Sequence, residues 1–190
     1  KVYCFASDGD LMEGISSEAS SFAGHQKLNN LIVFYDNNHI TIDGRTDISF
    51  SENVADRYKA YGWHITSVKN ANEDFNGISK AIKEANEVKD KPVLIVLNTI
   101  IGYGSDLQDT SKIHSTPPND EQLAKIKKRF GFNPDERFVV PKAVYDYYKN
   151  VHEANMKRVE EWNKNLHEYE SKYNADFQVL QKIINGDFRY

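Results

Sequence analysis

Apolar residues gather in short runs along the first half of the chain, and segments with helical patterns separate them. Four strands are expected, at 2–6, 31–35, 64–68 and 93–97, and the third has the weakest pattern. The second and fourth, "LIVFY" and "VLIVL", are apolar throughout, as in parallel strands covered on both faces. Helical spacing of apolar residues is found between the runs, at 15–25, 51–63 and 74–88. This alternation predicts an α/β fold: a parallel sheet with helices on both faces.

The pattern changes after the last of these strands. Residues 100–120, "IIGYGSDLQDTSKIHSTPPND", are rich in Gly, Ser, Asp and Pro, which predicts a long loop. Long loops inside compact domains are usually functional. A short helix is expected over 120–130, with Asp120 as its N-cap. From Pro141 a helical pattern runs to about residue 173, and a last amphipathic helix follows it.

Two parts are therefore expected: an α/β domain over 1–140 and a helical extension over 141–190. Residue 2 already begins a strand of core character. We accordingly expect the α/β domain to be incomplete at its N-terminus, and the chain to be the inner or C-terminal part of a larger protein.

The composition narrows the class of protein. With 39% hydrophobic and 27% charged residues, the chain is typical of a globular domain, and its net charge of −4 provides no basic field for nucleic acid. Cys4 is the single cysteine, read as a buried strand residue, which excludes an internal disulfide and fits a reducing cytosol. No apolar run of bilayer length is present. We expect a cytoplasmic protein without nucleic-acid or membrane partners.

Polar residues follow the first two strands, at the edge where ligands bind in open parallel sheets. Asp8 stands after the first strand and Asn38 after the second. Hard divalent cations prefer oxygen ligands, and the backbone carbonyl of Ile40 would supply a third. Gly9 leaves room for a bulky anion, and the next helix would direct its N-terminus at that anion. The pattern indicates a magnesium-bridged diphosphate site, although Asp, Gly and Asn are also common in ordinary turns.

Four stretches resemble transketolase. They are "SDGDLMEGISSEASSFAGHQKLNNLIVFYDNNHITIDGRTDISF", "VADRYKAYGW", "KPVLIVLNTIIGYGS" and "FGFNPDERFVVPKAVYDYY". The family's thiamine diphosphate signature, Gly-Asp-Gly followed by a spacer and Asn-Asn, corresponds to Ser7-Asp8-Gly9 and Asn37-Asn38. The resemblance implies the thiamine diphosphate-binding fold, as the later part of the N-terminal diphosphate-binding domain. The helical extension would then lead toward a pyrimidine-binding domain that lies outside this chain.

The resemblance also implies roles by position. Asp8, Asn38 and the Ile40 carbonyl would hold Mg²⁺ or Ca²⁺, and Gly9 would lie against the diphosphate. The other implied site residues are Ile42 and Ile101 beside the thiazolium, His114 at the diphosphate and the substrate, and Glu13 and Glu18 in an acidic relay between the two active sites of a dimer.

Simpler interpretations compete for several of these residues. Glu13 and Glu18 are also favourable charges at the start of a helix. Ile42 and Ile101 would serve as packing residues in any case, and His114 could be a solvated loop histidine.

Two departures from the family pattern bear on the site. Ser7 replaces the first glycine of the signature, which would add strain of about 1 kcal/mol if that position required a positive φ. In the long loop, Ser111 and Ser115 stand in place of a further histidine and of the glycine after His114.

The leading interpretation is a transketolase of the pentose phosphate pathway. It would use thiamine diphosphate and Mg²⁺ to transfer a two-carbon ketol group from a ketose phosphate to an aldose phosphate, as a homodimer. The chain alone is expected to be inactive, because the family's other catalytic groups lie outside it.

Two alternatives stay open. One is a related enzyme, such as dihydroxyacetone synthase or a dehydrogenase E1 component. The other is a degenerate or truncated domain that keeps the fold without the reaction. A nucleotide-binding Rossmann protein is disfavoured, because no G-x-G-x-x-G follows the first strand.

Overall fold

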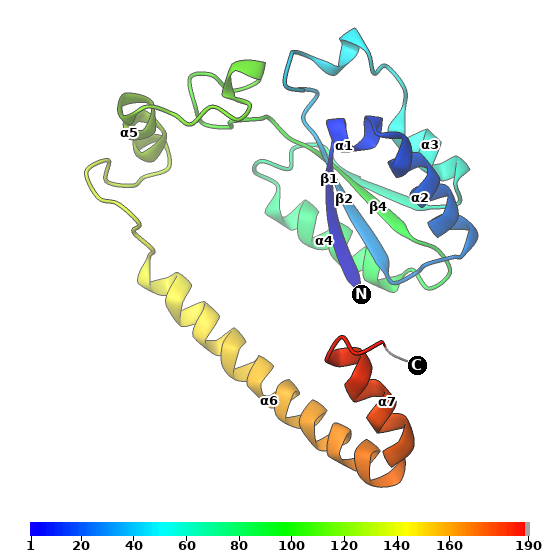
Figure 1. Cartoon of the computed structure of the whole chain (residues 1–190). Coiled ribbons are helices and arrows are strands. Elements are labelled where there is room, and N and C mark those ends of the chain that lie inside the picture. Colours follow the sequence, from blue (N-terminus) through cyan, green and yellow to red (C-terminus); the bar gives the residue numbers. More distant parts are fainter. Residues whose placement is uncertain (189–190) are drawn as a thin grey trace. The chain divides into compact units, whose positions relative to one another are not determined.

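A four-stranded parallel sheet forms the centre of the α/β unit (Figure 1). The computed structural model describes residues 1–188. The strands are β1 (Val2–Ser7), β2 (Leu31–Asn37), β3 (His64–Val68) and β4 (Val93–Asn98). Their order is β1-β2-β4-β3, so the two uninterrupted apolar runs form the two central strands. The predicted α/β fold with a parallel sheet is confirmed.

Helices cover both faces of this sheet (Figure 1). α2 (Gly14–His25) and α3 (Val54–Ala60) lie over one face, and α4 (Phe75–Glu87) lies over the other. Side chains of β2 and β4 point alternately to the two faces, as the pleat of a strand requires. The residues on the α2 and α3 side are Val33, Tyr35, Leu94 and Val96, and those on the α4 side are Ile32, Phe34, Val93 and Ile95. Two buried clusters result, one on each face.

β1 lies at an edge of the sheet and is more exposed than its sequence suggested. Within residues 1–188 it pairs only with β2. Cys4 is exposed, contrary to its reading as a buried strand residue, and Phe5 is 75% exposed. Apolar sequence predicts burial only where another layer covers the strand, and no described element covers these side chains.

Two helix boundaries differ from the pattern-based expectation. The polar residues that follow the first strand form a short helix, α1 (Asp8–Met12), and not an ordinary turn. The helix expected over 51–63 is the shorter α3, capped by the side chain of Asn53. Gly62 ends that segment with a φ of +88°, which glycine adopts without strain.

The long loop between β4 and α5 (Asp120–Arg129) contains only a 3₁₀ turn, η2 (Ser111–Ile113), in agreement with its composition. The N-cap of α5 is Asn119, one residue before the expected Asp120. Asn119 Oδ1 accepts a hydrogen bond from the Gln122 amide at 2.9 Å, and Gln122 Oε1 accepts one from the Asn119 amide at 2.9 Å. This reciprocal capping box selects Asn119 over the aspartate that follows it.

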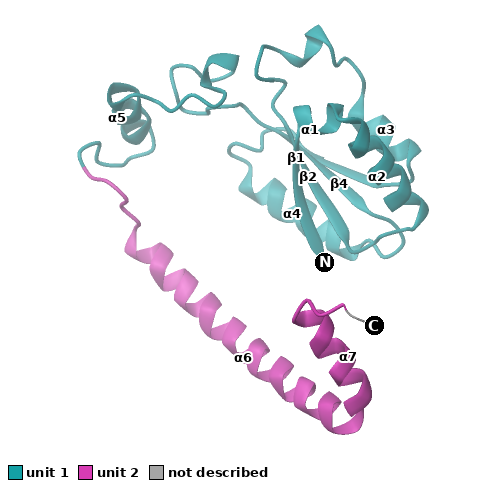
Figure 2. Ribbon diagram, in the orientation of Figure 1, with its two compact units in different colours: residues 1–135 teal, residues 136–190 magenta. Residues whose placement is uncertain are grey.

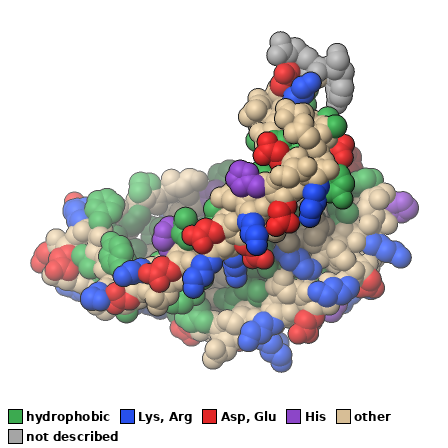
Figure 3. Space-filling view, turned by 90° about the horizontal axis from the view of Figure 1, so that it is seen from below, with side chains coloured by type: hydrophobic (Ala, Val, Ile, Leu, Met, Phe, Trp, Pro, Cys, Tyr) green, Lys and Arg blue, Asp and Glu red, His purple; other side chains and the backbone are tan. Residues whose placement is uncertain are grey.

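The chain divides into two compact units, residues 1–135 and 136–190 (Figure 2). The second unit holds α6 (Lys142–Lys172) and α7 (Asn174–Ile184), with Pro141 just before the first turn. Phe177 of α7 is buried, whereas α6 has no buried residue. Acidic and basic side chains are interspersed over the face shown in Figure 3. No helix within residues 1–188 has both the length and the apolar character that crossing a bilayer requires.

Candidate functional site

The carboxylate of Asp8 lies where the ends of β1 and β2 meet. Asp8 is the first residue of α1 and is only 1% exposed. Its Oδ2 accepts hydrogen bonds from the backbone amides of Asn38 at 3.1 Å and His39 at 2.8 Å. Its Oδ1 accepts a hydrogen bond from the hydroxyl of Tyr35. A buried carboxylate is thus stabilised by three donors, all from β2 or the turn that follows it.

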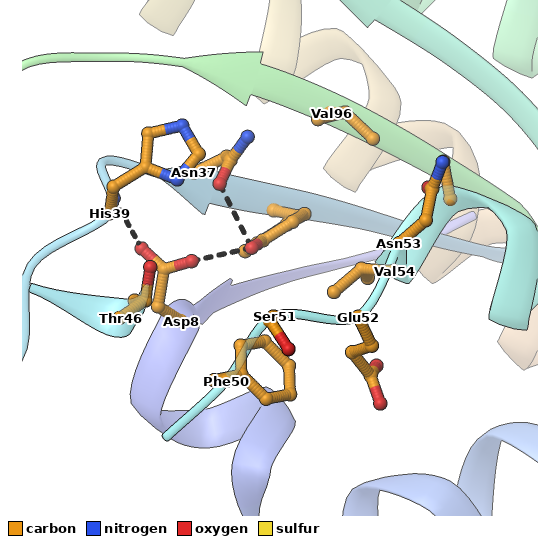
Figure 4. A pocket seen from close by; sticks show the side chains of 12 residues that line it. Asp8, Asn37, His39, Thr46, Phe50, Ser51, Glu52, Asn53, Val54 and Val96 are labelled. Atoms are coloured by element: carbon orange, nitrogen blue, oxygen red, sulfur yellow. Dashed lines mark hydrogen bonds between the residues drawn. The ribbon is translucent and has the colours of Figure 1, made fainter. Parts of the chain in front are cut away.

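The turn after β2 is shaped to present two successive amides to this carboxylate. His39 has a φ of +62°, the left-handed conformation that bends the chain sharply. Successive amides that converge on one anion in this way form a backbone nest. The Asp8 carboxylate occupies the nest in this structure (Figure 4).

Asn38 is held by its own side-chain hydrogen bonds. Its Oδ1 accepts from the amide of Ile40 at 3.0 Å, and its Nδ2 donates to Asp36 Oδ2 at 3.3 Å. Asp36 Oδ1 in turn accepts a hydrogen bond from the hydroxyl of Thr99, which follows β4. The amide group therefore has a defined orientation, with its oxygen on the side of Ile40.

Ile40 contributes backbone rather than side-chain chemistry. It forms an isolated antiparallel bridge with Arg45. The hydrogen bonds of this bridge are accepted by the carbonyls of His39 and Gly44, and not by that of Ile40. The carbonyl of Ile40 has no hydrogen-bond donor among residues 1–188. That oxygen is consequently available to a ligand.

A cleft of about 610 Å³ opens beside this cluster. Seven of the nine sequence-predicted site residues line it: Gly9, Glu13, Asn38, Ile40, Ile42, Ile101 and His114. Asp8 instead lines a neighbouring cavity of about 350 Å³, together with Asn37 and His39 (Figure 4). Glu18 is exposed on α2 and lines neither cavity. Tertiary structure thus brings the loop after β4 to the loops after β1 and β2.

The lining of the cleft is acidic. Asp10, Glu13, Asp36 and Asp43 contribute carboxylates, and no Lys or Arg side chain lines the cleft within the described residues. Such a site repels a bare diphosphate, so an anion of that kind would need a bridging cation. Among residues 1–188 no group of three or more His, Cys, Asp or Glu side chains is arranged for a metal ion. The available donor set is instead carboxylate, amide oxygen and backbone carbonyl, which suits Mg²⁺ or Ca²⁺.

The side chain of His114 is oriented by its neighbour in the long loop. The hydroxyl of Ser115 lies 3.0 Å from Nδ1 of His114. Nε2 has no hydrogen-bond partner within the described chain. If the serine donates to Nδ1, Nε2 carries the proton and can donate to an oxygen of a ligand.

The two departures in sequence have different structural outcomes. Ser7 has a φ of −100°, so the strain considered for this position does not arise. Its amide and hydroxyl both donate to Asp10 Oδ2, each at 2.8 Å, which closes the first turn of α1. Ser115 has a φ of +59°, a conformation in which glycine is unstrained and serine is not.

Sequence reasoning missed two residues of the site. Tyr35 stands inside the apolar run "LIVFY", where a tyrosine is read as packing. Asp36 directly follows that run, so its place at the carboxyl end of a parallel strand was a usable signal. The pKa of Tyr35 is raised well above its usual value, mainly by burial and then by the hydrogen bond to Asp8.

Comparison with known proteins identifies the family. The family described as "Transketolase, thiamine diphosphate binding domain" matches residues 1–189. The chain belongs to the transketolase family. It is 52% identical to transketolase 1 of Saccharomyces cerevisiae over 186 residues. The aligned region covers 97% of this chain and 27% of the yeast protein. It is 44% identical to the transketolase of Aquifex aeolicus, over 98% of this chain and 27% of that protein.

Solved transketolases share the fold. A transketolase from Pichia stipitis, in complex with sedoheptulose 7-phosphate, superposes with a TM-score of 0.90 at 45% identity, over 97% of this chain and 27% of that one. Transketolase from Leishmania mexicana superposes with a TM-score of 0.92 at 38% identity, over 97% and 28%. The chain thus spans about a quarter of the length of the transketolases that it matches, and corresponds to their thiamine diphosphate binding domain.

Proposed function

We propose that this chain supplies the metal and diphosphate half of a transketolase active site. The reaction would move a two-carbon ketol group from a ketose phosphate to an aldose phosphate, in the cytoplasm. Membership of the family supports the reaction class, and a relative solved with sedoheptulose 7-phosphate supports phosphorylated sugars as substrates. The proposal depends on one observation: residues that follow three different strands line the same acidic cleft.

The oxygen donors fit Mg²⁺ or Ca²⁺. A carboxylate has about four acceptor positions, and the hydrogen bonds to Asp8 use three of them. Asn38 Oδ1 retains one acceptor position beside its bond to Ile40, and the carbonyl of Ile40 retains both. Asp8, Asn38 and Ile40 would therefore hold the cation, and the diphosphate would complete its coordination.

The other predicted residues would position the cofactor. Gly9 lines the cleft, and a Cβ atom placed there would meet only the hydroxyl of Ser7, at 4.0 Å, so the diphosphate has room to approach. Ile42 and Ile101 would flank the thiazolium, and Nε2 of His114 would donate to a diphosphate or substrate oxygen. Bound thiamine diphosphate would supply the nucleophilic carbon for cleavage of the carbon–carbon bond.

Glu13 and Glu18 would act between subunits of a homodimer. Glu13 lines the cleft, and both carboxylates are exposed. Exposed carboxylates such as these are accessible to groups of a partner subunit. This role is the part of the proposal that depends on dimer formation.

Calorimetric titration tests the metal and diphosphate site directly. Thiamine diphosphate would be titrated, with and without Mg²⁺, into the natural polypeptide that contains this chain. We expect heat only with the metal, and we expect Asp8→Asn to abolish it. Asp43→Asn is the control for loss of an acidic charge, because Asp43 lines the cleft in which the cofactor would bind without belonging to the proposed ligand set. Binding that ignores the metal would contradict the site, and absence of binding would favour a degenerate domain.

Turnover assays test the reaction class. Xylulose 5-phosphate and ribose 5-phosphate are the substrates that a transketolase should convert. Turnover with formaldehyde as acceptor, in place of ribose 5-phosphate, would instead indicate a dihydroxyacetone synthase.

A further inference from the structure

Polar side chains at the ends of β1, β2 and β4 lie within hydrogen-bonding distance of one another, and Asp8, a proposed cation ligand, is one of them. Tyr35 of β2 donates its hydroxyl to Asp8 Oδ1, across the junction with β1. Oδ1 of Asn37 lies 3.0 Å from that hydroxyl, and Nδ2 of Asn37 donates to Asn98 Oδ1 of β4 at 2.7 Å. Figure 4 shows Asn37 and Asp8 on the wall of the smaller cavity. Asp8, Tyr35 and Asn37 line this cavity, and none of the three lines the larger cleft.

The hydroxyl of Tyr35 has one proton and two candidate acceptors. A carboxylate accepts more strongly than an amide, so the proton is directed to Asp8. The ring itself is 4% exposed and belongs to the buried cluster between the sheet and α2 and α3. The donor therefore sits on a rigid, central strand and cannot follow the carboxylate if the carboxylate rotates.

The hydrogen bonds of Asp8 decide which of its oxygens can meet a cation. Oδ2 has two acceptor positions, and the amides of Asn38 and His39 use both. Oδ1 has two as well, and Tyr35 uses one. The single remaining acceptor position is on Oδ1, and its direction depends on where the tyrosine donates.

We propose that Tyr35 is a positioning residue that fixes the orientation of Asp8 for cation binding. The inference rests on the proposed function, because it requires Asp8 to be a ligand. Tyr35 does not touch the cation itself. Its hydroxyl selects one rotational state of the carboxylate, so that the remaining acceptor position on Oδ1 is oriented before the cation arrives.

The chain offers a matched pair of substitutions for the test. Tyr35→Phe removes only the hydroxyl, and the ring stays in its packing site. Tyr58→Phe is the control: Tyr58 is also buried, at 2% exposed, and its hydroxyl accepts a hydrogen bond from Ser20 at 2.9 Å. Both changes remove one buried hydroxyl from the same cluster, but only the first touches Asp8.

The readout is the Mg²⁺ concentration that half-saturates binding of thiamine diphosphate, measured by tryptophan fluorescence on the natural polypeptide that contains this chain. Loss of a residue that orients a metal ligand typically weakens metal affinity by about 10–100-fold. We expect Tyr35→Phe to raise the half-saturating concentration by about tenfold or more. Tyr58→Phe should leave it unchanged, while urea unfolding shows comparable losses of stability for both variants.

The outcomes separate this inference from the proposed function. Equal Mg²⁺ requirements for Tyr35→Phe and the parent would overturn the positioning role and leave the cation site intact. An equal rise in Tyr58→Phe would show a general loss of packing and would also overturn it. If the parent shows no Mg²⁺-dependent binding, the proposed function fails first. Should Tyr35→Phe not fold, Tyr35→Met also lacks the hydroxyl and keeps a large apolar side chain in the buried cluster, and an unchanged Mg²⁺ requirement in that variant would overturn the role.

Discussion

Substitution of Gly9 by alanine tests whether a diphosphate binds in this cleft, because the change should affect the stability of the fold and the affinity for the ligand in opposite directions. Gly9 lies in the first turn of α1, and its φ is not positive. A Cβ atom there would meet only the Ser7 hydroxyl, at 4.0 Å. Gly9→Ala should therefore fold without strain, and alanine favours a helix over glycine by about 0.5–1 kcal/mol. We expect the free energy of unfolding to stay equal or to rise by that amount.

Ligand binding should respond in the opposite direction. The added methyl group would occupy space that a diphosphate needs, and overpacking of this kind costs about 1–3 kcal/mol. Since about 1.4 kcal/mol corresponds to a factor of ten, the affinity for thiamine diphosphate should fall by about 5–150-fold. Calorimetry with saturating Mg²⁺ measures this loss, and urea unfolding measures the stability of the same variant.

Gly14→Ala is the matched control. Gly14 begins α2, a Cβ atom there would meet nothing within 4 Å, and the residue does not line the cleft. It should share the small gain in stability and leave the affinity unchanged. Unaltered affinity in Gly9→Ala would contradict the placement of a diphosphate beside this glycine, and a loss of stability in that variant would contradict a position free of strain.

Three further changes test the fold that carries the site. Gly24→Ala should destabilise by about 2 kcal/mol or more in urea unfolding, because its Cβ would overlap the backbone carbonyl of Tyr61; unchanged stability would show that this helix contact is loose. Asn53→Ala should cost about 1 kcal/mol in the same assay, since its side chain caps α3; no cost would show that solvent replaces the cap. The hydrogen bond from His64 lowers the pKa of Glu84 below its usual 4.5, so this carboxylate stabilises the fold above that pH and loses the effect as the pH falls through the lowered value. Glu84→Gln should therefore be less stable than the parent at neutral pH, with the difference shrinking below pH 4.5, and a difference that ignores pH would exclude the pair as its source.

Much of the fold follows from local sequence because its strands and helices have distinct periods. "LIVFY" and "VLIVL" can be covered only as central strands, and the amphipathic pattern of 74–88 requires one face against the sheet. Cys4 shows where this reasoning stops. Its run is equally apolar, but exposure depends on whether another layer covers the strand, and a single strand's pattern does not encode its neighbours.

The candidate site, like the fold, could be predicted from the sequence only in part. Oxygen donors at the carboxyl ends of consecutive strands could be read from position alone, because parallel strands end at a common edge. Which atoms remain available could not, since the amides of Asn38 and His39 reach Asp8 only through the left-handed turn at His39. From the sequence, Tyr35 is interpreted as a packing residue. In the folded structure its hydroxyl also donates a hydrogen bond to Asp8. Periodicity reflects the burial of side chains one element at a time, whereas hydrogen bonds between strand ends exist only once the sheet has brought those ends together.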